Sequence, residues 1–162
     1  MSQLPAGAPD NAGAAFARIN AVTAPTIDDL KLMVYIEASG KSAYEALAQT
    51  TANAEIQRLL EANGREEMAH AHRVAKAIKL LSGEDFEPPA AQDNPYVSPS
   101  AAKVDRALLE YLVKIENNGD DLYQTWADNT ANAEAAALFR QNGKEEARHG
   151  ERAAQALALL DA

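Results

Sequence analysis

The sequence predicts an all-α fold, a four-helix bundle formed by a single domain. Alanine, leucine and glutamate are abundant, aromatic residues make up only 6% of the chain, and long stretches lack both proline and glycine. This composition is typical of helices rather than strands. Four stretches also repeat apolar residues at intervals of three and four, which marks one face of an amphipathic helix. The 162 residues can bury a sizeable core.

Residues 1–24 are rich in Ala, Gly and Pro, and we expect an N-terminal tail there, with one short helix around Ala12 to Asn20. Residues 25–162 are expected to form the bundle. Its first helix begins at Ile27, and its apolar face includes one charged residue, Glu37.

The second helix is expected to start near Asn53, a good N-cap residue, with Glu55 in its first turn, and to run to about Leu81. Its apolar stripe is interrupted by three polar residues, Asn63, Glu67 and His70. The first two helices thus form a hairpin over about residues 27–81, with polar side chains at its centre.

Residues 82–103 contain four prolines and predict a crossover loop. About 22 residues can span roughly 70 Å when extended, against roughly 40 Å for a helix of 27 residues. The loop can therefore carry the chain from one end of the bundle to the other. The second and third helices would then run parallel, as in bundles with one long crossover.

Residues 104–161 predict a second hairpin that repeats the first at an offset of 79 positions. The sequence Asn-Ala-Glu occurs at 53–55 and again at 132–134, where it caps the fourth helix. Glu116 lies on the third helix and corresponds to Glu37, while Glu146 and His149 on the fourth correspond to Glu67 and His70. The sequence therefore predicts two pseudo-symmetric hairpins.

Six residues of this repeat predict a metal site: Glu37, Glu67, His70, Glu116, Glu146 and His149. Residues three apart share a helix face, so each Glu-x-x-His directs a carboxylate and an imidazole to one point. The other two glutamates can bridge or chelate. Burying four carboxylates costs several kcal/mol per ion, and two divalent cations would offset that charge. Carboxylate and imidazole ligands suit iron or manganese, with zinc and copper left open.

Composition excludes other classes of function. The net charge of −9 argues against nucleic-acid binding, which needs a basic face. The sequence has no cysteine, which excludes disulfides, zinc-thiolate sites, iron–sulfur clusters and a rubredoxin-type module within it. It shows no signal peptide and no run near the roughly 18 apolar residues of a membrane span. A cytoplasmic location is therefore expected.

Residues 27–161 resemble the rubrerythrin-like and erythrin-type di-iron carboxylate proteins of the ferritin-like superfamily. The resemblance rests on Glu37, Glu116 and the sequences EEMAH at 66–70 and EEARH at 145–149. It implies that the six residues ligate two iron ions, with manganese or a mixed-metal pair as alternatives. It also implies reaction of the reduced pair with hydrogen peroxide or dioxygen, an external electron donor and a homodimer.

The chain departs from that family in two respects. Rubrerythrins carry an additional Glu one turn after the third-helix ligand, where this chain has Gly119, and they carry a rubredoxin domain. A non-haem di-iron oxidoreductase is therefore the leading interpretation rather than the sole one. A ferroxidase or iron-handling protein of bacterioferritin-like type, a di-iron oxygenase or oxidase, and a structural or partner-binding bundle also remain open.

Tyr44 and Tyr123 correspond across the repeat and lie two turns after Glu37 and Glu116. They resemble tyrosines that hydrogen-bond metal-ligating carboxylates, although core packing explains them equally well. Glu66 and Glu145 lie beside the proposed ligands, off the apolar stripe, and are expected to be solvated, as is His72.

Asn63 and Asn142 either orient a ligand or, with Gly64 and Gly143, mark a helix irregularity, which is the favoured interpretation. Gly40 and Gly119 each follow a proposed ligand by three residues. A glycine within a helix costs roughly 1 kcal/mol relative to alanine, so this matched pair needs a reason. Our hypothesis is that the two glycines leave a path for a small oxidant.

Overall fold

A computed structural model describes residues 3–100 and 102–160. Within these ranges the chain forms the α-helices α1 (Ala12–Asn20), α2 (Ile27–Ala48), α3 (Ala54–Ser82), α4 (Arg106–Asp128) and α5 (Ala133–Leu160), with a short 3-10 turn, η1 (Ala91–Asp93). The described residues contain no strand, which confirms the all-α class. None of their helices combines the length and apolar character that crossing a bilayer requires.

Side-chain caps fix the ends of the long helices where the sequence places them. The Asn53 side chain accepts hydrogen bonds from the backbone N–H groups of Glu55 and Ile56 at the start of α3. Asn132 accepts the equivalent bonds at the start of α5. At the other end of α3, Gly83 adopts a left-handed conformation with φ 78° and ends the helix.

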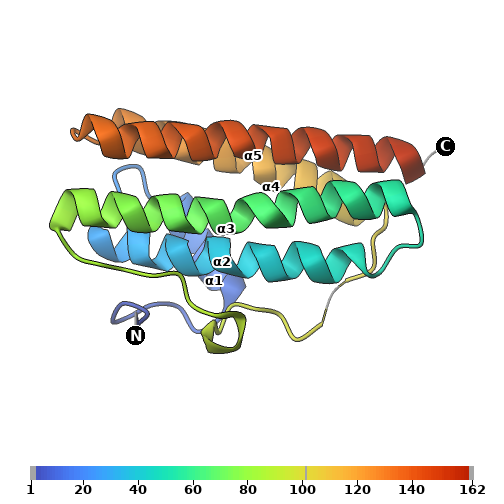
Figure 1. Cartoon of the computed structure of the whole chain (residues 1–162), viewed down its shortest axis with the longest axis horizontal. Coiled ribbons are helices and arrows are strands. Elements are labelled where there is room, and N and C mark those ends of the chain that lie inside the picture. The colour runs from blue at the N-terminus through green and yellow to red at the C-terminus, as the bar shows by residue number, and fades with distance from the viewer. Residues whose placement is uncertain (1–2, 101, 161–162) are drawn as a thin grey trace.

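The bundle consists of two helix pairs that meet along one side. α2 packs along α3, α4 packs along α5, and α3 packs on α5. The long helices lie roughly alongside one another in Figure 1, and the segment between α3 and α4 passes along the bundle from one end to the other. The backbones of α2 and α4 hardly approach one another closely, so the bundle is less tightly closed on that side.

Two apolar clusters fill the interior, one toward each end. The first includes Leu30, Val74, Trp126 and Phe139. The second consists of the following buried residues, with partly buried neighbours packed against it: Tyr44, Leu47, Ala48, Ile56, Leu59, Leu60, Leu109, Leu112, Ala153 and Ala156. Apart from Asp29 at the start of α2, the buried charged residues of the long helices lie near the point where the two clusters meet. The bundle therefore carries a polar layer at its middle, insulated on both sides.

The N-terminal region and the crossover segment are both fastened to the bundle. α1 packs on α2, and Arg18 forms an ion pair of 3.1 Å with Asp29. Asn94 donates a hydrogen bond to the backbone carbonyl of Tyr35, and Tyr96 donates one to that of Pro9. These contacts place α1 and part of the crossover segment beside α2.

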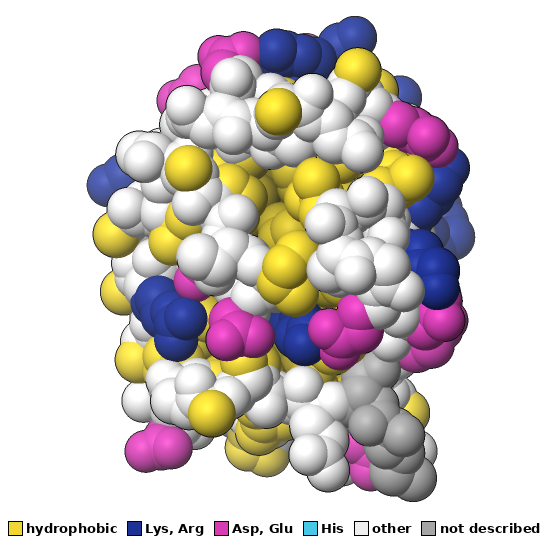
Figure 2. Space-filling model, turned by 90° about the vertical axis from the view of Figure 1, so that its left-hand side faces the viewer, with side chains coloured by type: hydrophobic (Ala, Val, Ile, Leu, Met, Phe, Trp, Pro, Cys, Tyr) yellow, Lys and Arg dark blue, Asp and Glu magenta, His cyan; other side chains and the backbone are white. Residues whose placement is uncertain are grey.

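Figure 2 shows one end of the bundle in space-filling form. Acidic and basic side chains are intermingled on this face, and hydrophobic atoms gather in a hollow near its centre. This face therefore presents no continuous basic patch of the kind that nucleic acid needs.

Candidate metal centre

The six residues expected to bind metal lie together in the polar layer. They come from all four long helices: Glu37 from α2, Glu67 and His70 from α3, Glu116 from α4, and Glu146 and His149 from α5. All are buried, and both histidines are 0% exposed. They form two four-residue groups in which the potential ligand atoms lie within 4.8 Å of one another, and Glu67 also groups with both histidines. The cluster therefore has the donor types and proximity that a metal site requires.

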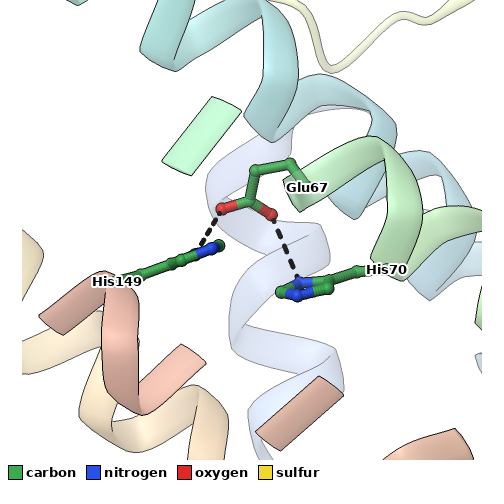
Figure 3. Close-up of side chains that lie close together, drawn as sticks. All are labelled: Glu67, His70 and His149. Atoms are coloured by element: carbon green, nitrogen blue, oxygen red, sulfur yellow. Dashed lines mark ion pairs between the residues drawn. The ribbon is translucent and has the colours of Figure 1, made fainter. Parts of the chain in front are cut away.

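Glu67 and Glu146 belong to both groups, whereas Glu37 belongs only to the group of His70 and Glu116 only to that of His149. In Figure 3 the carboxylate of Glu67 lies between the two histidines, with one oxygen toward each. Its oxygens are 3.8 Å from Nδ1 of His70 and 3.2 Å from Nδ1 of His149. The corresponding distances for Glu146 are 3.2 and 3.5 Å. The Glu-x-x-His carboxylates, rather than Glu37 and Glu116, thus lie between the two histidines and belong to both groups.

The imidazoles are oriented by the nitrogens that face away from the cluster. Nε2 of His70 lies 3.1 Å from Oε2 of Glu145. A hydrogen bond from His70, stronger than the opposing effect of burial, lowers the pKa of Glu145 to about 2. Glu145 is therefore an acceptor, and Nε2–H of His70 is the donor. A neutral imidazole of this tautomer directs the lone pair of Nδ1 toward the carboxylates.

Both inward nitrogens lack a hydrogen bond. Nδ1 of His70 and Nδ1 of His149 are the buried side-chain atoms without a hydrogen-bond partner among the described residues. Buried polar atoms are rarely left unpaired in folded proteins. A metal ion ligated through Nδ1 would satisfy each of them, so these residues fit the metal pair that the sequence implies.

The expectation that Glu66 and Glu145 are solvated is wrong. Glu145 is only 8% exposed, and Glu66 is partly buried. Each glutamate contacts the histidine of the opposite hairpin: Glu145 pairs with His70, and Glu66 Oε2 lies 3.0 Å from Nε2 of His149. A helical stripe describes one helix in isolation, whereas the packing of α3 on α5 brings the residue preceding each ligand into the interface. His72, in contrast, is exposed as expected.

Two arginines that the sequence analysis missed hold these outer carboxylates. Arg73 donates to both oxygens of Glu145, at 2.6 and 3.1 Å. Arg152 donates to both oxygens of Glu66, at 2.9 and 3.1 Å. Such two-point pairing fixes the carboxylate plane. The sequence does contain a pattern that could have identified these two arginines, because Arg73 and Arg152 also correspond across the repeat.

Asn63 and Asn142 join the same networks. Asn63 donates to the backbone carbonyl of His149 and accepts from Arg152, at 3.2 and 3.1 Å. Asn142 makes the equivalent contacts with His70 and Arg73, at 3.3 and 3.1 Å. α3 and α5 run without interruption through both positions. The favoured expectation of a helix irregularity is therefore wrong.

The neighbouring glycines allow close helix contact. A Cβ on Gly64 would lie 3.0 Å from Cβ of Tyr44 on α2. A Cβ on Gly143 would lie 2.7 Å from Oδ1 of Asp120 on α4. Gly64 and Gly143 thus let the two helices of each hairpin approach one another beside the polar layer.

The two tyrosines contact Glu37 and Glu116, and each tyrosine reaches across to the other hairpin. Tyr44 donates a hydrogen bond to Oε1 of Glu116, and Tyr123 donates one to Oε1 of Glu37. Tyr123 also packs against Trp126 and Phe139. The tyrosines therefore pack in the core and restrain a carboxylate at the same time.

Protonation balances the charge of the cluster when no metal is bound. Burial, reinforced by the charge of Glu146, raises the pKa of Glu37 to about 8. Burial likewise raises the pKa of Glu116 well above its usual range. Burial alone would lower the pKa of His149, but the neighbouring carboxylates of Glu116, Glu146 and Glu67 raise it to about 12. Without metal, the cluster thus retains protons in place of cations.

A helical bundle with a buried layer of four carboxylates and two inward-facing imidazoles defines the class of carboxylate-ligated metal proteins. The family model described as Rubrerythrin matches residues 30–157. The chain therefore belongs to the rubrerythrin family, and this membership together with the cluster supports a di-iron carboxylate protein. A search of curated proteins found no match, and a search of solved structures found none either.

Proposed function

We propose that the cluster holds two iron ions and that the loaded protein reduces hydrogen peroxide or activates dioxygen with electrons from an external donor. The proposed ligands are Glu37, Glu67, His70, Glu116, Glu146 and His149. The observation that carries the proposal is the pair of buried Nδ1 atoms without hydrogen bonds, each among carboxylate oxygens. When bound, the iron pair would supply two redox equivalents and a place for the oxidant.

Charge balance favours two divalent ions over one. With both histidines neutral, the four inner carboxylates carry four negative charges, and each outer carboxylate is already paired with an arginine. Two divalent cations neutralise the inner four. With a single ion, the other two charges would have to be balanced by retained protons, as in the metal-free cluster.

The protein's part in this function is to fix positions. Glu67 and Glu146 set the separation of the two metal positions because each contributes to both groups. Glu66 and Glu145 hold the tautomer and orientation of the histidines. Tyr44 and Tyr123 restrain the remaining two carboxylates. The apolar clusters on either side exclude bulk water from the polar layer.

The direct test is metal content after anaerobic reconstitution with Fe(II). We expect two irons per chain, lost in His149→Ala and Glu146→Ala and retained in His72→Ala, which removes an exposed histidine. Failure of the wild-type protein to retain any transition metal would contradict the proposal and leave a structural or partner-binding bundle.

The reaction is tested by mixing the ferrous protein with hydrogen peroxide and dioxygen separately. Oxidation by peroxide much faster than by oxygen, with repeated turnover when a donor is added, is the expected result for a peroxide-reducing enzyme. Iron accumulating beyond two per chain would instead establish the iron-handling alternative. The homodimer and the cytoplasmic location stay predictions, and the molecular mass in solution checks the first of them.

A further inference from the structure

A cavity of about 300 Å³ lies beside the polar layer, lined largely by α2 and α4 with contributions from α1 and the crossover segment. Its apolar lining includes Phe16, Ile19, Met33, Ile36, Leu112 and Ile115. α2 and α4 barely touch through their backbones, which leaves room for it. The cavity therefore occupies the side of the bundle that helix packing does not close.

The inner end of the cavity borders the carboxylates among the proposed metal ligands. Its lining includes Glu37, Glu67, Glu116 and Glu146, but neither histidine. Six positions of the lining recur across the repeat: Met33 with Leu112, Ile36 with Ile115, Glu37 with Glu116, Gly40 with Gly119, Ala43 with Leu122, and Glu67 with Glu146. Both hairpins thus build the cavity, and it lies on their pseudo-symmetry axis.

Gly40 and Gly119 keep this inner end open. A Cβ on Gly40 would lie 3.0 Å from Cδ and Oε2 of Glu67, and one on Gly119 would lie 3.3 Å from Cδ of Glu146. A side chain at either position would displace one of these carboxylates or take up part of the cavity. The two glycines, expected from the sequence to leave a path for an oxidant, therefore border a much larger space.

The size and lining of the cavity indicate what it can hold. Its volume is about ten times the roughly 30 Å³ that one water molecule occupies in the liquid, far more than peroxide or dioxygen needs. The lining contains no lysine, arginine or histidine. The four carboxylates at the inner end are balanced by metal ions or by retained protons, so this end holds no excess charge to attract a cation, and the lining offers no cationic side chain to an anion. An uncharged, mostly aliphatic molecule fits these conditions.

We propose that the cavity binds a neutral aliphatic organic molecule that extends from the surface to the carboxylates of the cluster. Its burial against apolar side chains supplies the affinity. The part of this proposal that places the molecule beside a metal pair rests on the proposed function. Binding in the cavity itself requires no metal, so the two proposals are separable by experiment.

The test is calorimetric titration of the full-length, metal-free protein with straight-chain alcohols from 1-butanol to 1-octanol. Each added methylene is expected to strengthen binding about fourfold until the cavity is filled. Ile115→Trp, which fills part of the cavity, is expected to weaken 1-octanol binding by about tenfold or more. Ala43→Phe provides the same test in case Ile115→Trp fails to fold, because Ala43 lines the cavity and is exposed.

The matched control is Ala46→Phe, at an exposed position on the same helix outside the lining, where 1-octanol binding should stay at the wild-type level. Absence of chain-length dependence, or equal effects of Ala43→Phe and Ala46→Phe, would overturn the proposal. One further result would overturn it: the wild-type protein is a dimer, Ala43→Phe dissociates that dimer, and 1-octanol does not bind. In that case a second copy of the chain would cover the cavity.

Metal content separates this proposal from the previous one. Two irons per chain with no alcohol binding would refute the organic ligand alone. Alcohol binding that responds to Ala43→Phe in a protein that never retains iron would refute the metal site alone.

Discussion

Glu145 on α5 accepts a hydrogen bond from His70 on α3 at 3.1 Å, so a carboxylate of one hairpin orients a proposed metal ligand of the other. The relationship is reciprocal, because Glu66 on α3 does the same for His149 on α5. The tyrosine contacts with Glu37 and Glu116 also cross between the hairpins. The repeat therefore builds one centre from interlocking halves rather than two centres side by side.

Glu145→Gln should weaken metal binding without unfolding the protein. The substitution removes the charged acceptor that holds Nε2–H of His70, and loss of such a partner typically costs about 10- to 100-fold in metal affinity. Competition with a chelator of known affinity measures the change. Glu134→Gln, which touches only a surface ion pair with Lys76, should leave the affinity at the wild-type value.

Arg73→Ala should destabilise the metal-free protein by about 2 kcal/mol, because it removes two hydrogen bonds to the buried carboxylate of Glu145 and leaves it only the half-exposed Arg148 as a cationic partner. Urea unfolding measures the free energy. Arg140→Ala removes an exposed pair with Asp128 and should cost less than about 1 kcal/mol. Equal losses in the two variants would show that Arg73 contributes only as a surface charge.

Gly40→Ala should reduce metal affinity while hardly reducing stability. The added Cβ would lie 3.0 Å from the carboxylate of Glu67, which must shift, whereas alanine stabilises a helix by about 1 kcal/mol relative to glycine. Metal titration and thermal unfolding together separate the two effects. Gly13→Ala on α1, whose Cβ would meet only Asn11 Oδ1 at 3.5 Å, should leave metal affinity unaltered.

Tyr44→Phe and Tyr123→Phe should each lower stability by about 1 kcal/mol, because each removes a buried hydrogen bond to a carboxylate. Tyr111, which is 57% exposed, supplies the control variant Tyr111→Phe, with no expected change. Similar losses for the first two would follow from the pseudo-symmetry of the centre. A loss confined to one of them would show that the two halves contribute unequally.

Asp29→Asn should destabilise the protein at pH 7 by about 1 kcal/mol, and this difference should shrink in acid. Burial acts to raise the pKa of Asp29, but hydrogen bonds from Thr26 and Arg18 lower it below its ordinary value of 3.8. Because the folded pKa is the lower one, the stabilisation is present above pH 3.8 and is lost as the pH falls through the folded pKa. Urea unfolding at pH 7 and pH 3 checks this; a difference that grows in acid would contradict it.

The helix periodicity and the repeat at an offset of 79 positions were enough to predict the all-α class, the start of α3 at Asn53 and the grouping of six residues. Periodicity within one helix failed for Glu66 and Glu145, because their burial arises from the contact between α3 and α5. It also passed over Arg73, which a helical stripe assigns to solvent. The cavity could not be predicted, since it depends on how far apart α2 and α4 lie.

Glu67 and Glu146 each belong to both groups. Glu66, Glu145 and the two tyrosines all reach across to the opposite hairpin. Neither half of the centre can therefore change independently. A substitution in the polar layer of residues 27–81 alters the surroundings of a residue near position 116 or 149, and the reverse also holds. Duplication has thus produced two segments that are copies in sequence yet obligate complements in space. Engineering this protein therefore means altering positions in pairs.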